Sequence, residues 1–306
     1  MANNELSIVI PSFNRGQVLL DCVSSLRDLD SEIKIVVVDQ TLEHEEDIAS
    51  TLEAWHRDNK IEWLRLSKPS VVVAMNRGLI HCRSNYVLFL DDDIIPEPGL
   101  ITNHLKLISQ LRPPLIAGRV IQPWDKAEGI ANNSEANFSF NGLKQCKTQC
   151  FMGGNFALDR NIALALGGFD ENFVGTAHDY ERDFSDRLKS AGHQAIFNGA
   201  AAIKHLKVSD GGIRSYGNLL KTIKPHQSVG AYYFILRAEQ IKNKPLKLLQ
   251  RLRQRLFNRS QLKHPWWIPI TFIGDLVGFI WALKLYYSGA KLIPQDDIEA
   301  DSKNRP

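Results

Sequence analysis

Three adjacent acidic residues, Asp91-Asp92-Asp93, are the side chains of this sequence best suited to chemistry. They directly follow the apolar run 86–90. Like charges at the end of a buried strand repel one another unless a cation or several hydrogen-bond donors face them. Mg²⁺ prefers such oxygen ligands and is often shared between carboxylates and substrate phosphates. The triplet therefore indicates either a site for a metal and a diphosphate or a solvated acidic turn.

The elements expected around the triplet favour the metal and diphosphate site. Apolar runs are expected to form strands at 6–10, 33–38, 61–66, 86–90 and 115–121, with helices at 17–26, 43–56 and 72–82. This alternation predicts an α/β fold, with a mostly parallel sheet and helices on both faces. Ligands of such folds bind beyond the carboxyl ends of the strands. Residues 11–15, 39–41 and 91–93 should therefore meet at one edge.

Composition and cysteine content describe an ordinary globular protein. The 306 residues are 44% hydrophobic and 23% charged, and the net charge of +3 indicates no particular partner. Cys146 and Cys150 are the only close cysteine pair, and no second pair completes a zinc pattern. The residues after Met1 do not form a charged-then-apolar signal peptide. We therefore expect the catalytic part in the cytoplasm, in a reducing setting.

Several short motifs follow one another between about residues 6 and 206. They are 8–15 (IVIPSFNR), 36–39 (VVVD), 74–79 (AMNRGL), 90–93 (LDDD), 153–156 (GGNF), 167–171 (GGFDE), 181–188 (ERDFSDRL) and His205. In this order and spacing the chain resembles the family 2 glycosyltransferases. The resemblance implies the GT-A fold, which is Rossmann-like. It also implies an inverting enzyme that uses a nucleotide-diphosphate sugar, with a UDP- or dTDP-sugar favoured.

The resemblance also implies a donor site at the strand ends. The donor-binding residues are then Pro11, Ser12, Asn14, Arg15, Asp39, Asn76, Arg77, Asp91 and Asp92. Asp39 matches the acid that reads a uracil or thymine edge, a role that suits a carboxylate because it accepts from an imide N–H. The alternative for Asp39 is a helix cap after a strand. Two departures bear on the donor: Gln40-Thr41 stands where the family often has Asp-Gly, and Met75 replaces an arginine that can approach the donor phosphates.

A divalent cation, Mn²⁺ or Mg²⁺, is the cofactor that the resemblance implies. Its candidate ligands are Asp93, Asp91 and His205, and Asp91 also matches a residue nearer the ribose. In related enzymes a histidine at this place can join the metal or the diphosphate, whereas a lone histidine is more often structural, so both alternatives stay open. Gly153-Gly154 either brings the backbone close to the donor, since glycine removes side-chain bulk, or forms an ordinary turn.

An inverting transfer also needs one carboxylate to accept the proton of the acceptor hydroxyl. Aligning Arg187-Leu188 with the Arg-Leu pair of the family places Glu181 at the base position, which is more often aspartate. Asp183 then matches the second acid of that motif, and Asp179 lies just outside it. The alternative is a solvated acidic face at the start of a helix, where acidic residues favour the helix dipole.

The composition changes beyond residue 217. Residues 242–263 carry eight lysines and arginines with leucines between them and no acidic residue, and the aromatic, apolar stretch 265–287 follows. Such a pair of segments is typical of attachment to an anionic membrane surface. Because Asp275 would be costly at the bilayer centre, lying in the interface is favoured over spanning. The alternatives are a helical pair packed on the main domain, and nucleic-acid binding, which no other module in the chain supports.

Together these features predict a GT-A domain at 1–217, with a nucleotide-sugar half (1–121) and an acceptor half (122–217), and a membrane-interfacial helical region at 218–306. We expect a peripheral enzyme at the cytoplasmic face of the cell membrane. It would act on a glycan or lipid-linked acceptor in cell-surface polysaccharide synthesis, without nucleic acid, and is compatible with a homo-oligomer. One alternative is a sugar nucleotidyltransferase, which should show a glycine-rich basic loop that 11–16 lacks. The other is a non-catalytic nucleotide-sugar-binding protein, which would need no base.

Overall fold

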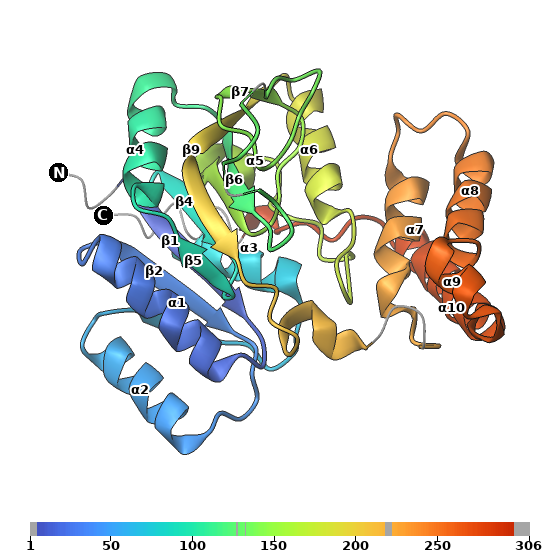
Figure 1. Cartoon of the computed structure of the whole chain (residues 1–306), viewed down its shortest axis with the longest axis horizontal. Helices are drawn as coiled ribbons and strands as arrows, with labels where there is room; N and C mark the ends of the chain where they lie inside the picture. The colour runs from blue at the N-terminus through green and yellow to red at the C-terminus, as the bar shows by residue number, and fades with distance from the viewer. Residues whose placement is uncertain (1–4, 127, 132, 218–221, 297–306) are drawn as a thin grey trace.

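The structure, a computed structural model, describes residues 5–126, 128–131, 133–217 and 222–296. A twisted sheet lies between two layers of helices, and a group of helices from the carboxyl-terminal part of the chain stands beside it (Figure 1). The α/β architecture expected from the alternating pattern is therefore present. Two parts of the sheet differ in the direction of their strands.

The amino-terminal part of the chain forms four parallel strands, as the apolar runs predict, and then two strands that join the mixed part of the sheet. Its elements are β1 (Leu6–Ser12), α1 (Gly16–Leu29), β2 (Lys34–Asp39), α2 (Glu46–Arg57), β3 (Glu62–Arg65), α3 (Val71–His81), β4 (Tyr86–Leu90), β5 (Ile94–Pro96), α4 (Leu100–Leu111) and β6 (Leu115–Ile121). β1 pairs in parallel with β2 and β4, and β2 pairs in parallel with β3. The carboxyl ends of these strands therefore meet at one edge.

The second part of the sheet is mixed. Its elements are β7 (Cys146–Thr148), β8 (Asn155–Asp159), α5 (Arg160–Ala165), α6 (Tyr180–Ser190) and β9 (Ala195–His205). β8 pairs antiparallel with β4 and β6, whereas β6 and β9 are parallel. Among the described strands the order is β3-β2-β1-β4-β8-β6-β9-β5, with β7 beside β9. Residues 156–158 are fully buried in the centre of this sheet, although the sequence pattern showed only a glycine motif there.

Alternate residues of the central strands point to opposite faces and build two hydrophobic cores. On one face Val9 and Phe89 pack in a cluster with α3, α5 and α6. On the other face Ile8 and Leu88 pack in a cluster with α1, α2 and α4. Helices therefore cover both faces, and the polar strand ends are held by rigid elements on either side.

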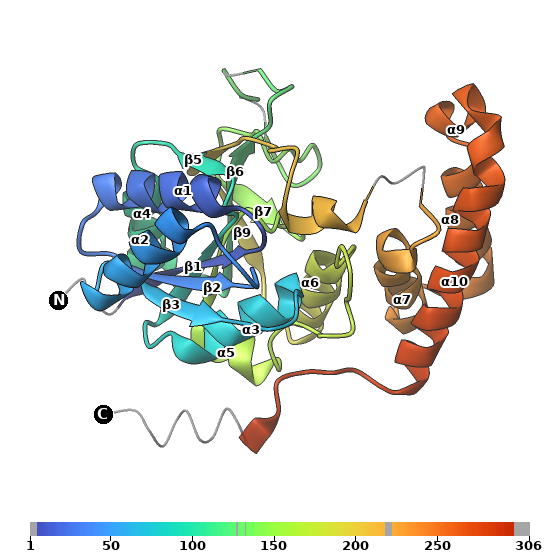
Figure 2. The ribbon, with the colours of Figure 1, turned by 90° about the horizontal axis from the view of Figure 1, so that it is seen from below.

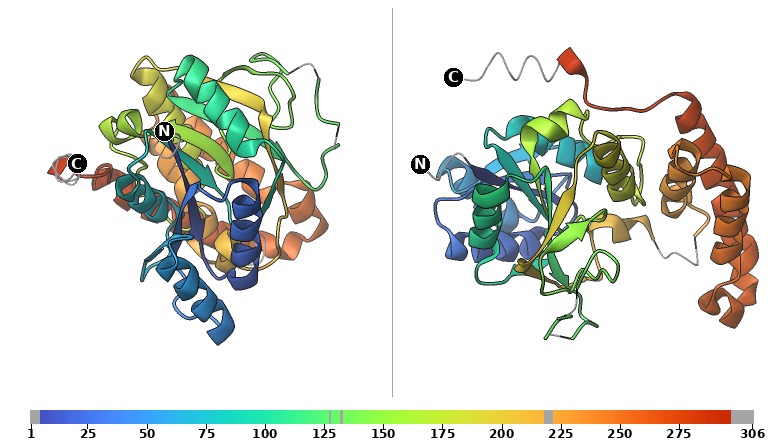
Figure 3. Two further views of the ribbon diagram at one scale, coloured as in Figure 1. Left: turned by 90° about the vertical axis from the view of Figure 1, so that its left-hand side faces the viewer. Right: turned by 90° about the horizontal axis from the view of Figure 1, so that it is seen from above.

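The carboxyl-terminal part of the chain forms a helical lobe, defined here as α7 to α10. The elements after β9 are η2 (Gly212–Tyr216), η3 (Pro225–Gln227), α7 (Val229–Arg237), α8 (Lys244–Leu256), α9 (Arg259–Lys263), η4 (Pro265–Trp267) and α10 (Ile268–Tyr287). Figure 2 and Figure 3 show this lobe beside the sheet domain. They also show residues 288–296, called here the return segment, which run back to the sheet domain after α10.

The helical lobe shares its core with the sheet domain. Tyr233 of α7 is buried in the same cluster as residues of α6, and the return segment is fixed by a hydrogen bond of 2.9 Å from Ile293 N–H to the carbonyl of Gly167. The predicted division between residues 217 and 218 stays a prediction. It adjoins residues 218–221, which lie outside the described residues, as do residues 1–4 and 297–306 at the predicted domain ends.

Candidate active site

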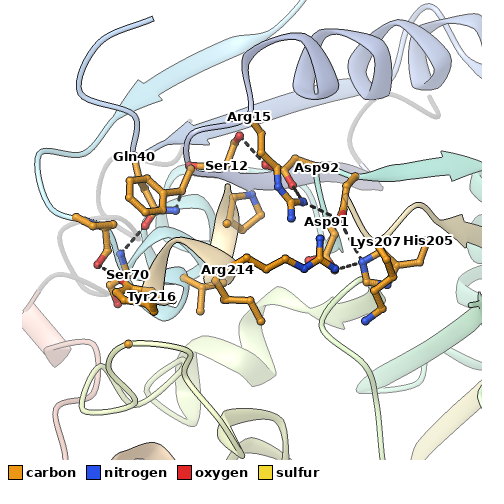
Figure 4. Close-up of a pocket in the computed structure, with 18 residues that line it drawn as sticks. Ser12, Arg15, Gln40, Ser70, Asp91, Asp92, His205, Lys207, Arg214 and Tyr216 are labelled. Carbon is orange, nitrogen blue, oxygen red and sulfur yellow. Dashed lines mark hydrogen bonds and ion pairs between the residues drawn. The ribbon is translucent and has the colours of Figure 1, made fainter. Parts of the chain in front are cut away.

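A pocket opens at the carboxyl ends of β1 and β4, beside the end of β9 (Figure 4). Its described walls include the loop after β1, the acidic triplet after β4, the segment that follows β9, and residues 69–71 where α3 begins. The predicted site residues that it brings together are Pro11, Ser12, Arg15, Asp91, Asp92, Asp93 and His205. A pocket is therefore present at the edge of the sheet where the carboxyl ends of the parallel strands were expected to meet.

Arg15 allows three adjacent carboxylates to coexist. Its Nη1 lies 2.7 Å from an oxygen of Asp92 and 2.8 Å from an oxygen of Asp93, and Ser12 Oγ donates to Asp92 at 2.7 Å. Burial raises the pKa of Asp92 to about 6, although Arg15 and Ser12 lower it. Asp91 is the most open of the three, with 38% of its side chain exposed. Asp92 is thus held by protein groups, and Asp91 faces the pocket.

Asp91, Asp93 and His205 form a group that could hold a divalent cation. One ligand atom from each lies within 4.8 Å of the others, and His205 Nε2 lies 3.2 Å from Asp93 and 3.7 Å from Asp91. Strand pairing explains this, because His205 of β9 lies opposite Ile94, the residue after Asp93. Although burial opposes it, His205 and Arg15 lower the pKa of Asp93. Two carboxylates and an imidazole suit a cation of this class, so the geometry favours the metal alternative for His205.

Asp39 ends β2 opposite Ser12, at the edge predicted for it, but its side chain does not line the pocket. Its side chain is fully buried, one oxygen accepts from Thr41 N–H at 2.9 Å, and the other accepts from Trp63 Nε1 at 3.1 Å and lies 2.6 Å from His44 Nε2. Three polar groups already engage this carboxylate, and none of its surface is exposed. The neighbouring Gln40 lines the pocket instead. Asp39 is thus engaged within the protein, and its base-reading role stays a prediction.

Three more predicted donor contacts fall outside the pocket. Asn76 is buried in α3, where its side chain donates to the Phe169 carbonyl and accepts from the Phe169 N–H, both at 2.8 Å. Arg77 is exposed on the same helix, and among the described residues Asn14 does not line the pocket. Met75 is 1% exposed in the core. This part of α3 therefore packs in the core and holds the loop at Phe169, and it does not line the pocket.

The segment after β9 supplies pocket residues that the motifs did not reveal. They are Lys207, Arg214 and Tyr216. Figure 4 shows the Arg214 side chain extending across the pocket, and its Nη1 is buried with no hydrogen-bond partner among the described residues. Gly211-Gly212, both with positive φ, make the turn into η2. This glycine pair was the signal in the sequence that could have marked the segment.

Glu181, at the start of α6, lies against the same glycine pair as the acidic triplet. A Cβ on Gly153 would be 3.5 Å from Glu181 Oε1, and a Cβ on Gly154 would be 2.8 Å from Asp91 Oδ2. Burial raises the pKa of Glu181 to about 7, and the charges of Asp179 and Asp91 act in the same direction. A carboxyl group that titrates near neutrality suits a general base. Gly154 therefore leaves room for Asp91, whereas a contact of 3.5 Å at Gly153 would be ordinary for Glu181, so both alternatives for the glycine pair stay open.

The other two predicted acids have cationic partners. Asp183 is buried between Arg187 Nε at 2.9 Å and Arg237 Nε at 2.8 Å. Asp179, in a left-handed conformation with φ 71°, pairs with Arg182 at 3.0 Å. Of the three, Glu181 alone makes no ion pair with a described residue. The geometry therefore favours Glu181 as the proton acceptor and gives Asp183 a structural place between α6 and α7.

Solved structures share this architecture at low sequence identity. One is the mannosyltransferase PcManGT from Pyrobaculum calidifontis in complex with GDP-Man and Mn²⁺, with a TM-score of 0.56 and 16% identity, covering 94% of this chain and 80% of that one. Another is GalNAc-T7 with UDP, GalNAc and Mn²⁺, with a TM-score of 0.52 and 13% identity, covering 82% of this chain and 54% of that one. These similarities confirm the GT-A fold.

Sequence comparisons lead to the same group of enzymes. The chain is 26% identical over 216 residues to the pre-mycofactocin glycosyltransferase of Mycobacterium tuberculosis, covering 67% of this chain and 43% of that protein. It is 26% identical over 226 residues to the chondroitin synthase of Escherichia coli, covering 61% of this chain and 32% of that protein. The chain thus spans less than half the length of these curated relatives. The model of "Glycosyl transferase family 2" matches residues 7–167, which is more than half of the chain, and the protein therefore belongs to this family of glycosyltransferases.

Proposed function

We propose that this glycosyltransferase inverts the anomeric centre of a nucleoside-diphosphate sugar as it transfers the sugar to an acceptor hydroxyl. The observation that carries the proposal is that two acidic groups approach the adjacent glycines Gly153-Gly154. Glu181 lies near Gly153, and Asp91 of the candidate metal-binding group lies near Gly154. A base close to a diphosphate site is what a direct displacement requires.

In this proposal Glu181, which is not among the residues that line the pocket, acts together with residues that do. Glu181 accepts the proton of the attacking hydroxyl. Asp91, Asp93 and His205 would hold the divalent cation, Mn²⁺ or Mg²⁺, which when bound supplies positive charge for the leaving diphosphate. Lys207 and Arg214 add cationic groups to the lining of the pocket. These two residues could supply the positive charge near the donor phosphates that the family often takes from an arginine at the position of Met75.

The proposal concerns nucleoside-diphosphate sugars as a class. The expectation of a UDP- or dTDP-sugar rested on Asp39, whose carboxylate is engaged by His44 and Trp63. Release of nucleoside diphosphate from a panel of UDP-, dTDP- and GDP-sugars, with Mn²⁺, Mg²⁺ or chelator, tests the proposal. We expect slow, metal-dependent release from one nucleotide series. Donor binding without any release, with every acceptor offered, would instead indicate a nucleotide-sugar-binding protein, and full activity in chelator would contradict the metal-dependent mechanism.

We also propose that the helical lobe attaches the enzyme peripherally to an anionic membrane surface, as expected at the cytoplasmic face. One described stretch, Pro265–Tyr287, is long and apolar enough to cross a membrane, with 23 residues and a mean hydropathy of 1.6. Its exposed apolar side chains include Phe272, Ile273, Leu276, Val277 and Ile280. Exposed basic side chains lie nearby in the chain, at Arg259, Lys263 and Lys284. This combination of an apolar face and basic residues supports an anionic lipid surface as the partner.

The contacts of Asp275 favour lying on the surface over spanning. Its carboxylate is buried inside the lobe, where one oxygen lies 3.3 Å from Arg255 Nε and the other accepts from Tyr232 OH at 3.1 Å. The polar side of α10 therefore faces α7 and α8. An isolated transmembrane helix would have to break these contacts and place the charge in lipid. The apolar side of α10 remains free to enter the interface.

A further inference from the structure

A second cavity lies between the start of α6 and the helical lobe. Its volume is about 320 Å³. The polar wall comes from both sides of this boundary, with Asp179 and Arg182 from the sheet domain and Lys247, Gln250, Arg251 and Gln254 from α8. Phe234, Ile235 and Ile241 add an apolar wall. The pocket of the acidic triplet shares none of these residues.

The cavity carries an excess of positive charge. Three cations face it, and the single carboxylate, Asp179, is already paired with Arg182 at 3.0 Å. Lys247 and Arg251 make no ion pair with a described residue, and Arg251 Nε is buried without a hydrogen-bond acceptor among the described residues. A buried guanidinium N–H without an acceptor is unfavourable. The cavity therefore offers positive charge and a guanidinium N–H that an anion could engage.

The position of the cavity relates that anion to the reaction. Asp179 and Arg182 flank Glu181 in the chain, so the cavity lies at the helix start that carries the proposed base. On α8, Lys247, Arg251 and Gln254 recur at helical spacing and face the cavity. Leu246 and Leu249 of the same helix are 47% and 63% exposed. The helix that supplies the cationic wall thus also carries exposed apolar side chains.

We propose that this cavity binds the phosphate or diphosphate group of a lipid-linked acceptor. The inference rests on the proposed function, because it assumes that Glu181 activates an acceptor hydroxyl. With its phosphate held by Arg251 and Lys247, the acceptor presents its sugar towards Glu181 and its lipid chain towards α8 and α10. The forked guanidinium of Arg251 matches phosphate oxygens well.

Two double variants with the same loss of charge test this site. Lys247→Gln/Arg251→Gln removes two cations from the cavity, and Lys242→Gln/Arg253→Gln removes two exposed cations outside it. Binding of farnesyl diphosphate to the full-length protein in detergent, without donor, is measured by calorimetry. We expect the cavity variant to bind at least about tenfold more weakly, since hydrogen bonds to charged groups are lost. The control variant should bind like the native protein, and farnesol should bind far more weakly than farnesyl diphosphate.

Further comparisons distinguish a lipid-linked diphosphate from inorganic diphosphate and from the headgroups of a bilayer. Equal losses in the two double variants would show a general charge effect and overturn the site. Inorganic diphosphate that binds as tightly as farnesyl diphosphate would overturn the lipid-linked acceptor. A cavity variant that loses binding only to phosphatidylglycerol vesicles would assign the cavity to bilayer headgroups and overturn it as well. These measurements need no catalysis, so a native chain that binds the probe here but never releases nucleoside diphosphate would refute the proposed transfer and leave the phosphate site standing.

Discussion

At the scale of single residues, the surroundings of two acids on one helix determine which of them can be a base. Glu181 and Asp183 are two positions apart on α6. Asp183 is held between Arg187 and Arg237, whereas Glu181 is half-buried near the Gly153 backbone and makes no ion pair with a described residue. Cationic partners keep a carboxylate ionised and weakly basic, while burial without one makes it a better proton acceptor.

Replacing Glu181 by glutamine should remove the proton acceptor and keep the shape of the side chain. We expect kcat to fall by roughly 10²–10⁴-fold with donor binding nearly unchanged. Steady-state kinetics together with nucleotide titration measure both effects. Asp186→Asn on the same helix is the matched control and should stay near the native rate. If Glu181→Gln is active and Asp183→Asn or Asp179→Asn is inactive, the base must be reassigned.

The raised pKa of Glu181 also predicts opposite pH trends for rate and stability. Because the base must be ionised, kcat/KM should rise with pH through about 7. The folded-state pKa lies above the ordinary value of 4.5, so the ionised form is disfavoured in the fold. Stability from this group is therefore present at low pH and is lost as pH rises from 4.5 through about 7. The measurement is the melting temperature of Glu181→Gln minus that of the native protein, taken in chelator at several pH values. This difference should increase between about pH 5 and pH 8, because only the native protein loses the stability of the protonated group. A difference that does not change with pH would argue against the raised pKa.

Asp39 should matter for stability more than for the donor. Asp39→Ala leaves His44 and the indole N–H of Trp63 without their buried acceptor. We expect a loss of about 3 kcal/mol in the free energy of unfolding, and a donor KM within a few-fold of native. Chemical denaturation and kinetics measure the two effects, with the exposed Asp58→Ala as control. A large rise in donor KM at unchanged stability would restore Asp39 to the donor site.

At the scale of elements, the turn at Gly211-Gly212 and the short η2 helix close one side of the donor pocket. Arg214→Gln should raise the donor KM by about tenfold, because a charged hydrogen bond to the diphosphate is lost. Arg77→Gln removes the same charge from an exposed position on α3 that the family motif had favoured, and should leave KM unchanged. The reverse result, a KM effect at Arg77 and none at Arg214, would show that the motif and not the pocket identifies the phosphate contact.

At the scale of the whole molecule, the helical lobe is a part of the fold that cannot be removed cleanly. Tyr233 of α7 and Ile293 of the return segment belong to the core of the sheet domain. A chain cut near residue 233 would expose that core, so its loss of membrane binding would mean little. Substitutions on the exposed face of α10 are the better test.

Ile273→Asp/Leu276→Asp should weaken binding of the full-length protein to vesicles that contain phosphatidylglycerol, and native binding should decline as salt rises. Both side chains are about half exposed, at 51% and 47%, and attraction to surface charge is screened over about 8 Å at physiological salt. Vesicle sedimentation measures the effect, and an unchanged melting temperature checks the fold. Equal sedimentation of variant and native protein would place the attachment elsewhere.

The sequence by itself determined the alternating α/β pattern, the acidic triplet at a strand end, the alignment that singles out Glu181, and the family. These are properties of local periodicity and of the order of motifs along the chain. The tertiary structure decided which side chains meet. Pairing of β9 with β5 brings His205 to Asp93, and the rotation of α3 turns Asn76 into the core. The packing of α10 likewise gives Asp275 a buried arginine partner. Strand register and helix rotation are set by contacts between residues far apart in the chain, which local patterns do not record.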